Sequence, residues 1–288
     1  APVRSLARDG YRRLACIDRL DVSPLGAGAL AGSTLPIDPE LTAAELGFAG
    51  VFDNSLDAVS DRDFVAEAMF CLSLVAVHLS RLGEEVVLWA SEEFGFLGLD
   101  DGYSTGSSMM PQKKNPDIAE LARGKAGRVI GGLTGLLVVL KGLPLAYNRD
   151  LQEDKEPLFD SVEQVSLGLS AMAGLLATAE LRTEQMAASA DDPLAAATDL
   201  AELLVRQGVP FRDAHAVVGA LVRGALAGEG SLAELVAAEP RLGEEGVALL
   251  APGASARARI SRGSGGPDAV AAQLDRFRAR LEHDRNRR

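Results

Sequence analysis

The chain has 288 residues, 24% of them charged, with a formal net charge of −12 and a pI near 4.8. This acidic balance argues against nucleic acid or an anionic membrane surface as a partner, although the last residues include a small basic cluster, Arg285, Arg287 and Arg288. Two cysteines are too few for a secreted disulfide framework, and we expect no apolar run to span a bilayer. We therefore predict a cytoplasmic protein with its own hydrophobic core.

The first segment, 1–14, has the pattern of the end of a helix and leads into 18–21. The stretch 26–32 then reads GAGALAG. Its GxGxxxG spacing and the lack of a preceding strand do not match a nucleotide-binding loop. We predict instead a tight crossing of the backbone.

A long helix is predicted between Phe64 and Trp89, because apolar residues recur there at steps of three or four. They are Phe64, Ala68, Cys71, Val75, Leu79, Leu82, Val86 and Trp89. Ser60 is a candidate N-cap for this helix, with Asp63 three residues later. His78 falls inside the helical stripe, so we expect it to be a packed residue between helices.

Residues 106–115 read GSSMMPQKKN and combine two adjacent hydroxyls, Ser107 and Ser108, with two ammonium groups and an amide. Such a cluster is suited to binding negative charge. The preceding residues contain three glycines and little helical periodicity, so we predict a mobile loop over 95–115. Asn115 is a favoured N-cap and would start a helix whose positive end attracts anions. The alternative for an isolated stretch of this composition is a solvated Ser/Lys loop.

Two further long helices are predicted, one over 115–141 and one over about 157–183. The first of these contains five glycines, Gly124, Gly127, Gly131, Gly132 and Gly135. Glycine lowers helix propensity, and the usual return is a close approach of neighbouring helices. Helices this long bury little within one small globule, so they indicate a multi-chain bundle.

Past Ala187 the predicted units become shorter, with helix starts at Asp192-Pro193, Pro210, Ser231 and Pro267. We therefore predict an all-α fold with two domains. The first, 1–187, is a bundle of long helices that carries the serine loop. The second, 188–288, is a small helical domain.

The pattern G-S-S-x-M-P-x-K-x-N, complete in 106–115, resembles the signature of the aspartase/fumarase superfamily of lyases. The resemblance implies a helical homotetramer of the aspartase/fumarase type that eliminates fumarate from a succinyl compound. It also implies that Ser107 is the catalytic base. Lys113 and Asn115 would hold the carboxylate of the substrate.

Further segments are similar to the argininosuccinate lyase family, and the resemblance extends over essentially the whole chain. They are 21–32, 54–64, 147–156, 197–200, 208–215 and 261–266. The segment 147–156, YNRDLQEDKE, would otherwise be interpreted as a solvated charged loop entering a helix. In this family Tyr147, Gln152 and Lys155 match the positions that bind the arginine part of the substrate.

Three more residues complete the expected substrate site. Arg62 offers a planar fork for a succinyl carboxylate, although a structural role in the first turn of its helix competes with this role. Asn54 and Ser108 are expected as further contacts. The reaction needs no metal or organic cofactor, and the three histidines and two cysteines have no metal-ligand spacing.

The resemblance thus implies cleavage of argininosuccinate to arginine and fumarate, a step of arginine biosynthesis, in a site shared between subunits. One alternative is a sister lyase with another fumarate-yielding substrate. Another is a non-catalytic structural relative, similar to the lens crystallins that share this fold. Family members have a further N-terminal region with a T-H-x-Q motif whose histidine contributes to the acid step, and 1–288 lacks that motif. We expect either a fragment of a longer chain or a truncated relative.

Overall fold

The computed structural model describes residues 2–106, 109–110 and 113–285, and these confirm the all-α prediction. The chain forms two compact units, Ala1–Leu181 and Arg182–Arg288. The change of domain predicted after residue 187 falls within α7 (Thr183–Ala190), which belongs to the second unit.

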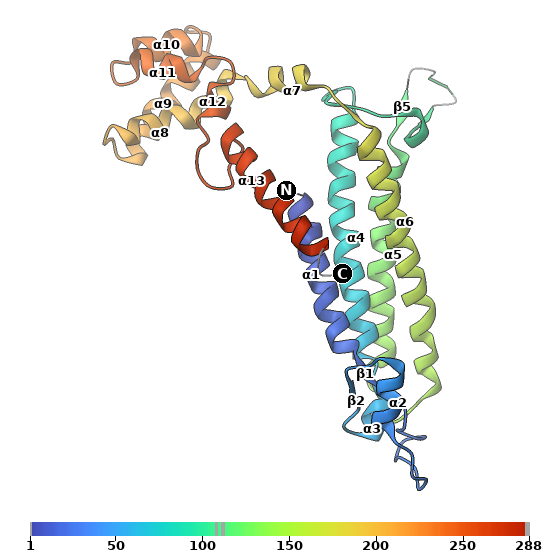
Figure 1. Cartoon of the computed structure of the whole chain (residues 1–288). Helices are drawn as coiled ribbons and strands as arrows, with labels where there is room; N and C mark the ends of the chain where they lie inside the picture. Colours follow the sequence, from blue (N-terminus) through green and yellow to red (C-terminus); the bar gives the residue numbers. More distant parts are fainter. Residues whose placement is uncertain (1, 107–108, 111–112, 286–288) are drawn as a thin grey trace. The chain divides into compact units, whose positions relative to one another are not determined.

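Four long helices build the first unit: α1 (Pro2–Leu20), α4 (Asp63–Ala90), α5 (Asp117–Leu140) and α6 (Lys155–Thr178). The central helix is α4, which packs against the other three (Figure 1). Its predicted apolar stripe is correct at Cys71, Leu79 and Val86, which are buried. Phe64 is exposed instead, and Met69 is fully buried where α4 meets α5.

By length and composition alone, α4 could cross a membrane, so the expectation that no segment qualifies was wrong. Its apolar composition has a second explanation within the fold. A helix that contacts three others needs apolar residues on several sides, whereas a helix on the outside of a bundle needs only one stripe.

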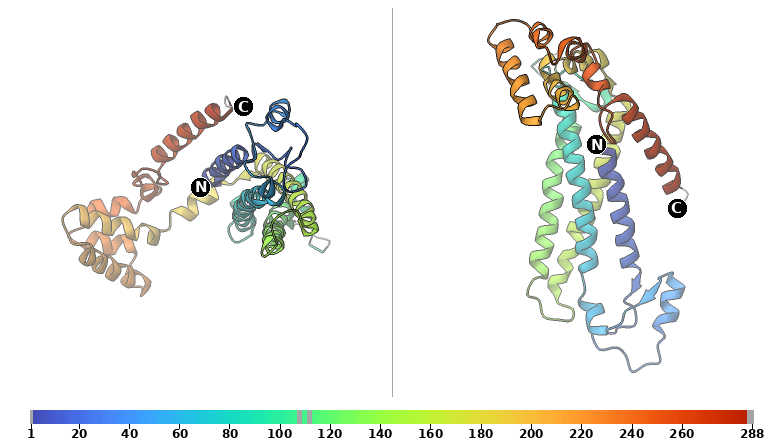
Figure 2. Two further views of the ribbon diagram at one scale, coloured as in Figure 1. Left: turned by 90° about the horizontal axis from the view of Figure 1, so that it is seen from below. Right: turned by 90° about the vertical axis from the view of Figure 1, so that its left-hand side faces the viewer.

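Polar pairs fix the antiparallel register of neighbouring helices in the bundle. Arg123 of α5 donates to Glu84 of α4 at 2.5 Å. Arg128 of α5 donates to both oxygens of Asp160 on α6, at 2.7 and 2.6 Å. Lys125 contacts Gln164 while Arg128 contacts Asp160, and Gly83 faces Ala119 while Met69 faces Gly132. In both cases the residue numbers rise along one helix as they fall along the other, so the chain runs up and down through α4, α5 and α6 (Figure 2).

Short elements connect the long helices at the end of the bundle where α4 begins. They are β1 (Val22–Ser23), α2 (Pro39–Leu46), β2 (Gly50–Val51) and α3 (Ser55–Ser60), with β1 parallel to β2. Gly28 has φ of 64°, and a Cβ there would overlap the backbone oxygen of Gly32, whose own N–H donates to the oxygen of Ala27 at 2.9 Å. The tight backbone crossing predicted for 26–32 is therefore confirmed.

The opposite end of the bundle carries short elements between α4 and α5 and after α6. They are β3 (Leu97–Gly98), η1 (Asp101–Tyr103), β4 (Thr105–Gly106), β5 (Lys114–Asn115) and β6 (Glu180–Leu181). At the end where α4 begins, the 3-10 helix η2 (Arg149–Asp154) lies between α5 and α6.

The second unit contains short helices around a core of its own. After α7 these are η3 (Pro193–Ala196), α8 (Ala197–Arg206), α9 (Phe211–Leu226), α10 (Leu232–Ala238), α11 (Gly243–Leu249), α12 (Ala254–Arg257) and α13 (Pro267–Arg285). Leu200, Leu204 and Val236 are fully buried there. Asp192 and Ser231 cap helical segments as predicted, Ser231 through a complete capping box.

Replacing Gly83 with alanine tests the close approach of α4 and α5. A Cβ on Gly83 would lie 2.5 Å from the backbone oxygen of Ala119. We expect Gly83→Ala to lower the free energy of unfolding in urea by about 1–3 kcal/mol, because the two backbones must separate. The matched control is Gly10→Ala in α1, where a Cβ meets nothing within 4 Å. It should stabilise the protein by about 0.5–1 kcal/mol, and an equal gain at Gly83 would contradict the packing.

Candidate functional site

The segment 95–115 is anchored at several points rather than free over its whole length. β3 pairs antiparallel with β6, and β4 pairs antiparallel with β5. The ring of Tyr103 lies against Gly174 of α6, in space that a Cβ at that position would occupy. The mobile loop predicted over 95–115 is therefore held in the fold at β3, at Tyr103 and at the β4–β5 pair. Ser107 and Ser108, predicted as base and substrate contact, lie outside the described residues.

The two lysines of the motif have different surroundings. Lys114 is tied to the base of the segment, where its Nζ donates to the backbone oxygen of Leu99 at 3.1 Å and pairs with Asp101 at 2.7 Å. Lys113 is exposed, and its backbone N–H donates to the oxygen of Met110 at 3.0 Å. Lys113, which was predicted to bind substrate, is therefore exposed, and its neighbour Lys114 makes contacts within the fold.

Asn115 does not cap α5, so that prediction was wrong. Its backbone is paired with Thr105 in the β4–β5 ladder, and Pro116 becomes the N-cap residue without a side-chain bond. Asp117 in the first turn accepts from the backbone N–H of Thr105 at 3.2 Å and from its hydroxyl. The start of α5 is therefore bonded to β4, the strand that leads into residues 106–115, which we call the serine segment.

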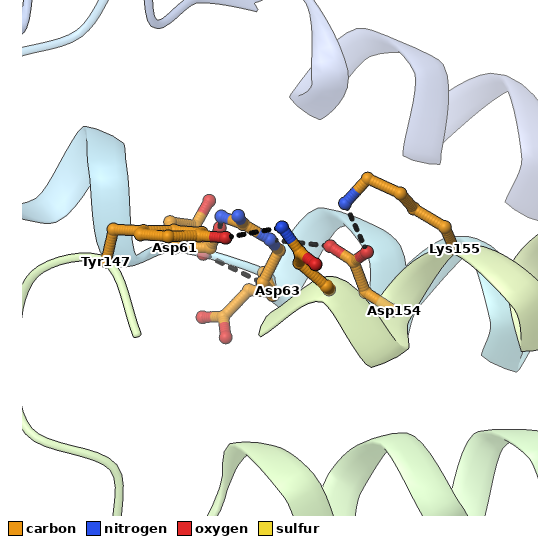
Figure 3. Close-up of polar contacts among 7 residues, drawn as sticks. Asp61, Asp63, Tyr147, Asp154 and Lys155 are labelled. Atoms are coloured by element: carbon orange, nitrogen blue, oxygen red, sulfur yellow. Dashed lines mark hydrogen bonds and ion pairs between the residues drawn. The ribbon is translucent and has the colours of Figure 1, made fainter. Parts of the chain in front are cut away.

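At the other end of the bundle, Asp154 joins two predicted site residues (Figure 3). Its carboxylate accepts from Nε of Arg62 at 2.6 Å and from Nζ of Lys155 at 2.8 Å. The side chain of Asp154 is only 7% exposed, whereas that of Lys155 is 58% exposed. Sequence reasoning did not single out Asp154, although it directly precedes Lys155 within YNRDLQEDK.

Arg62 is the N-cap residue of α4, and the predicted cap Ser60 is instead the last residue of α3. Two of the Arg62 donors are used within the chain, one by Asp154 and one by the backbone oxygen of Asp61 at 2.5 Å. This arrangement favours the competing structural role of Arg62 over a direct contact with a succinyl carboxylate.

Tyr147 and Gln152 lie close together in the same region. Nε2 of Gln152 donates to the phenol oxygen of Tyr147 at 3.0 Å, and both side chains are exposed. The turn that carries them is held by the amide of Asn148, which donates to the backbone oxygens of Pro144 and Ala146. Leu151 between them is buried. Tyr147, Asp154 and Lys155 thus lie in one region, with Gln152 bonded to Tyr147 and Arg62 bonded to Asp154 (Figure 3).

Asn54 has a structural role as the N-cap residue of α3. Its side-chain oxygen accepts from the backbone N–H groups of Leu56 and Asp57, both at 3.0 Å, and so caps α3. The residue is exposed. A contact with substrate would have to use the other face of its amide.

The predicted site residues form two groups at opposite ends of the long bundle. Lys113 and Asn115 follow the end of α4, whereas Arg62 immediately precedes its start (Figure 1). The 28 residues of α4 span roughly 40 Å at about 1.5 Å per residue. One copy of the chain therefore does not bring the two groups together.

The remaining polar clusters do not resemble a metal centre. Over the described ranges, no group of three or more His, Cys, Asp or Glu side chains could hold a metal ion. His78 lies with its Nδ1 2.6 Å from Oδ2 of Asp9 on α1, and its side chain is 12% exposed. This confirms the prediction of a packed histidine between helices.

Comparisons with known proteins agree along most of the chain. A family model described as "Lyase" matches residues 2–131, and one described as "Argininosuccinate lyase C-terminal" matches residues 194–257. Argininosuccinate lyases from Moorella thermoacetica and Frankia casuarinae are 58% and 54% identical, over 94% and 99% of this chain. The chain belongs to the argininosuccinate lyase family. It spans 60% and 62% of the length of these two relatives.

Solved structures place the family fold in the aspartase/fumarase superfamily. An EDDS lyase, solved in complex with formate, matches with a TM-score of 0.88 and 31% identity over 98% of this chain and 59% of its own. A class II fumarase from Schistosoma mansoni matches with a TM-score of 0.73 over 85% of this chain and 55% of its own. At 18% identity, the second match speaks for the fold alone.

Neutralising Asp154 tests how this family member holds Arg62 and Lys155. Asp154→Asn leaves the two cations with a weaker, neutral acceptor, so we expect the free energy of unfolding to fall by about 1.5–3 kcal/mol. The matched control is Asp160→Asn, which weakens the more exposed pair with Arg128 and should lower it by less than about 1 kcal/mol. Chemical denaturation at neutral pH measures both, and equal losses would contradict the role given to Asp154.

Proposed function

We propose that the chain acts as an argininosuccinate lyase and cleaves argininosuccinate to arginine and fumarate. The observation that carries the proposal is the complete serine motif at 106–115, together with identities of 58% and 54% to two argininosuccinate lyases over nearly the whole chain. The cluster of Tyr147, Gln152 and Lys155 supports the substrate class, since it offers a phenol, an amide and an ammonium group to an amino-acid head.

The proposed reaction removes a proton from the carbon next to one succinyl carboxylate and breaks the bond between the neighbouring carbon and the guanidinium nitrogen. That nitrogen keeps the bonding electron pair and takes up a proton as arginine leaves. The negative charge that develops spreads onto the adjacent carboxylate. Fixed donors aimed at this charge are the largest single catalytic contribution. Lys113 and Asn115 take that part, and the same positive surroundings stabilise the oxyanion that Ser107 needs to act as the base.

At the arginine end, Lys155 offers its exposed ammonium group to the α-carboxylate of the arginine part. Asp154 serves as a positioning residue, because it fixes the Nζ of Lys155 at 2.8 Å while remaining buried itself. Ser108 and Asn54 complete the proposed contacts. The site uses only side chains and backbone donors.

The proposal includes a homotetramer with sites shared between subunits. A substrate of this size cannot reach across the roughly 40 Å of α4 that separate Lys113 from the region of Tyr147 and Lys155, so complementary groups must come from different copies. The outer face of α5 supports such association, because Cβ atoms on Gly124, Gly127, Gly131 and Gly135 would meet nothing within 4 Å. The close helix approach that these glycines permit is therefore open to a second chain.

A second candidate is another fumarate-releasing lyase of the same superfamily. The observation in its favour is the EDDS lyase, which shares 31% identity and of which one structure contains bound fumarate. Its substrate differs from argininosuccinate beyond the succinyl part, so the residues around Tyr147 should decide between the two.

Fumarate release, followed by its ultraviolet absorbance, tests the function with argininosuccinate and with adenylosuccinate as substrates. We expect turnover of argininosuccinate only. Ser107→Ala should abolish turnover while binding of argininosuccinate, measured by calorimetry, is largely kept, because only the base is lost. Lys113→Met should weaken both binding and rate. Turnover of adenylosuccinate alone, or an active Ser107→Ala variant, would refute the respective parts of the proposal.

Bulk on the glycine face tests the assembly. Gly131→Leu places a large side chain where two chains would approach closely, so we expect sedimentation to show smaller species than the wild-type oligomer. Gly10→Leu on α1, equally open in the structure, is the matched control and should leave the oligomer intact. An unchanged oligomer in both variants would exclude this face as the interface.

A further inference from the structure

The two cysteines of the chain lie outside the proposed site, and both are buried. Cys16 belongs to α1 and is 3% exposed, whereas Cys71 belongs to α4 and is 8% exposed. The chain contains no other cysteine. Burial in an all-helical core is ordinary for a single thiol, so the informative feature is how these two lie relative to each other.

The register between α1 and α4 sets the two thiols opposite each other. Asp9 contacts His78 at 2.6 Å, and these residues lie two helical turns from Cys16 and Cys71 respectively. Arg19 pairs with Glu67 one turn in the other direction. Because the helices are antiparallel, a pair that lies between these two bridges in the same register faces across the interface. The thiols are close enough for each to influence the pKa of the other.

Burial is the main reason that the pKa values of both thiols are raised. Burial, helped by the nearby Cys71 and by Glu67, raises the pKa of Cys16 to about 11. Burial also raises the pKa of Cys71, while the hydrogen bond from Cys16 and the charges of Arg12 and Arg19 oppose that rise. Asp9 and His78 complete the charged or titratable groups on the facing turns. The partner thiol favours the thiolate at Cys71 and disfavours it at Cys16, so Cys71 is assigned as the thiol that reacts first.

We propose that Cys16 and Cys71 form a disulfide on oxidation and that this bond links α1 covalently to α4. With a hydroperoxide as the oxidant, the Cys71 thiolate takes up one peroxide oxygen to become a sulfenic acid, and the peroxide is reduced to water or an alcohol. The Cys16 thiol then attacks that sulfur, the S–S bond forms and water leaves. The two thiols lose two electrons and two protons in total, which the hydroperoxide accepts.

The bond would act mainly on the unfolded state. It closes a loop that contains α2, α3 and the start of α4, so it restricts the unfolded chain while adding little to a pair that already touches. Oxidant reaches the pair only when α1 opens locally from α4, and ionisation at neutral pH is rare. The modification should therefore be slow and should accelerate with pH.

The experiment treats the full chain with hydrogen peroxide at about pH 8.5, near the pKa of a free thiol. We expect the intact mass to fall by two hydrogen atoms and a peptide map to contain Cys16 linked to Cys71. The midpoint of thermal unfolding should rise by about 4 °C or more and return to its initial value after reduction. At neutral pH the reaction should be about tenfold slower or more, as the thiolate fraction is smaller.

Cys71→Ser and Cys71→Ala are the matched variants, the second in case a buried hydroxyl disturbs folding. Both should show no thermal shift on oxidation. Peroxide-treated wild-type protein that gains oxygen on separate cysteines, or that forms only linked dimers, would overturn the proposal. The same thermal gain in the Cys71 variants would overturn it as well. None of these outcomes depends on lyase activity.

Discussion

The length of α4 is the constraint on which the functional interpretation depends. Arg62 stands at one end of this helix and the serine segment follows the other, so the two groups of site residues are held roughly 40 Å apart. Closing a loop of a few residues cannot bridge such a distance. Either the groups serve different sites or several copies of the chain combine them, and only the second possibility uses the whole motif set for one reaction.

A site assembled from several chains requires that each long helix keeps its register with the neighbouring helices. Apolar contacts along α4 are numerous but allow sliding by a turn, because similar side chains recur at each turn. Polar pairs such as Glu84–Arg123 and Asp160–Arg128 do not repeat in this way. Their contribution to stability is small where they are exposed, so their main effect is to select one register.

The fold was largely predictable from the sequence because its helices are long and their periodicity is strong. The helix starts at Ser231 and Pro267 also followed from local chemistry. Tertiary pairing decided the exceptions. Asn115 would cap a helix in isolation, but it pairs with Thr105, and the N-cap of α5 moves by one residue to Pro116. Likewise, Ser60 does not cap α4 as predicted, because it is the last residue of α3.

The site was predictable only as a list of residues, because the sequence does not contain the distances between them. Its planar guanidinium suggested that Arg62 could bind substrate, yet one of its donors meets Asp154, which lies 92 positions later in the chain. In the same way, Lys113 and Lys114 are equivalent by composition. Only the structure shows that Lys114 is paired with Asp101 while Lys113 lies at the surface.

The charges of the two ends differ in a way that fits the two products of the proposed reaction. Around Tyr147, three carboxylates, Asp61, Asp63 and Asp154, outnumber the two cations Arg62 and Lys155 (Figure 3). An excess of negative charge there favours a guanidinium group, which leaves as a cation. The serine segment instead presents Lys113 and a helix start, both suited to a dianion such as fumarate. A substrate lying between copies of the two ends would be polarised in the direction in which its bond breaks.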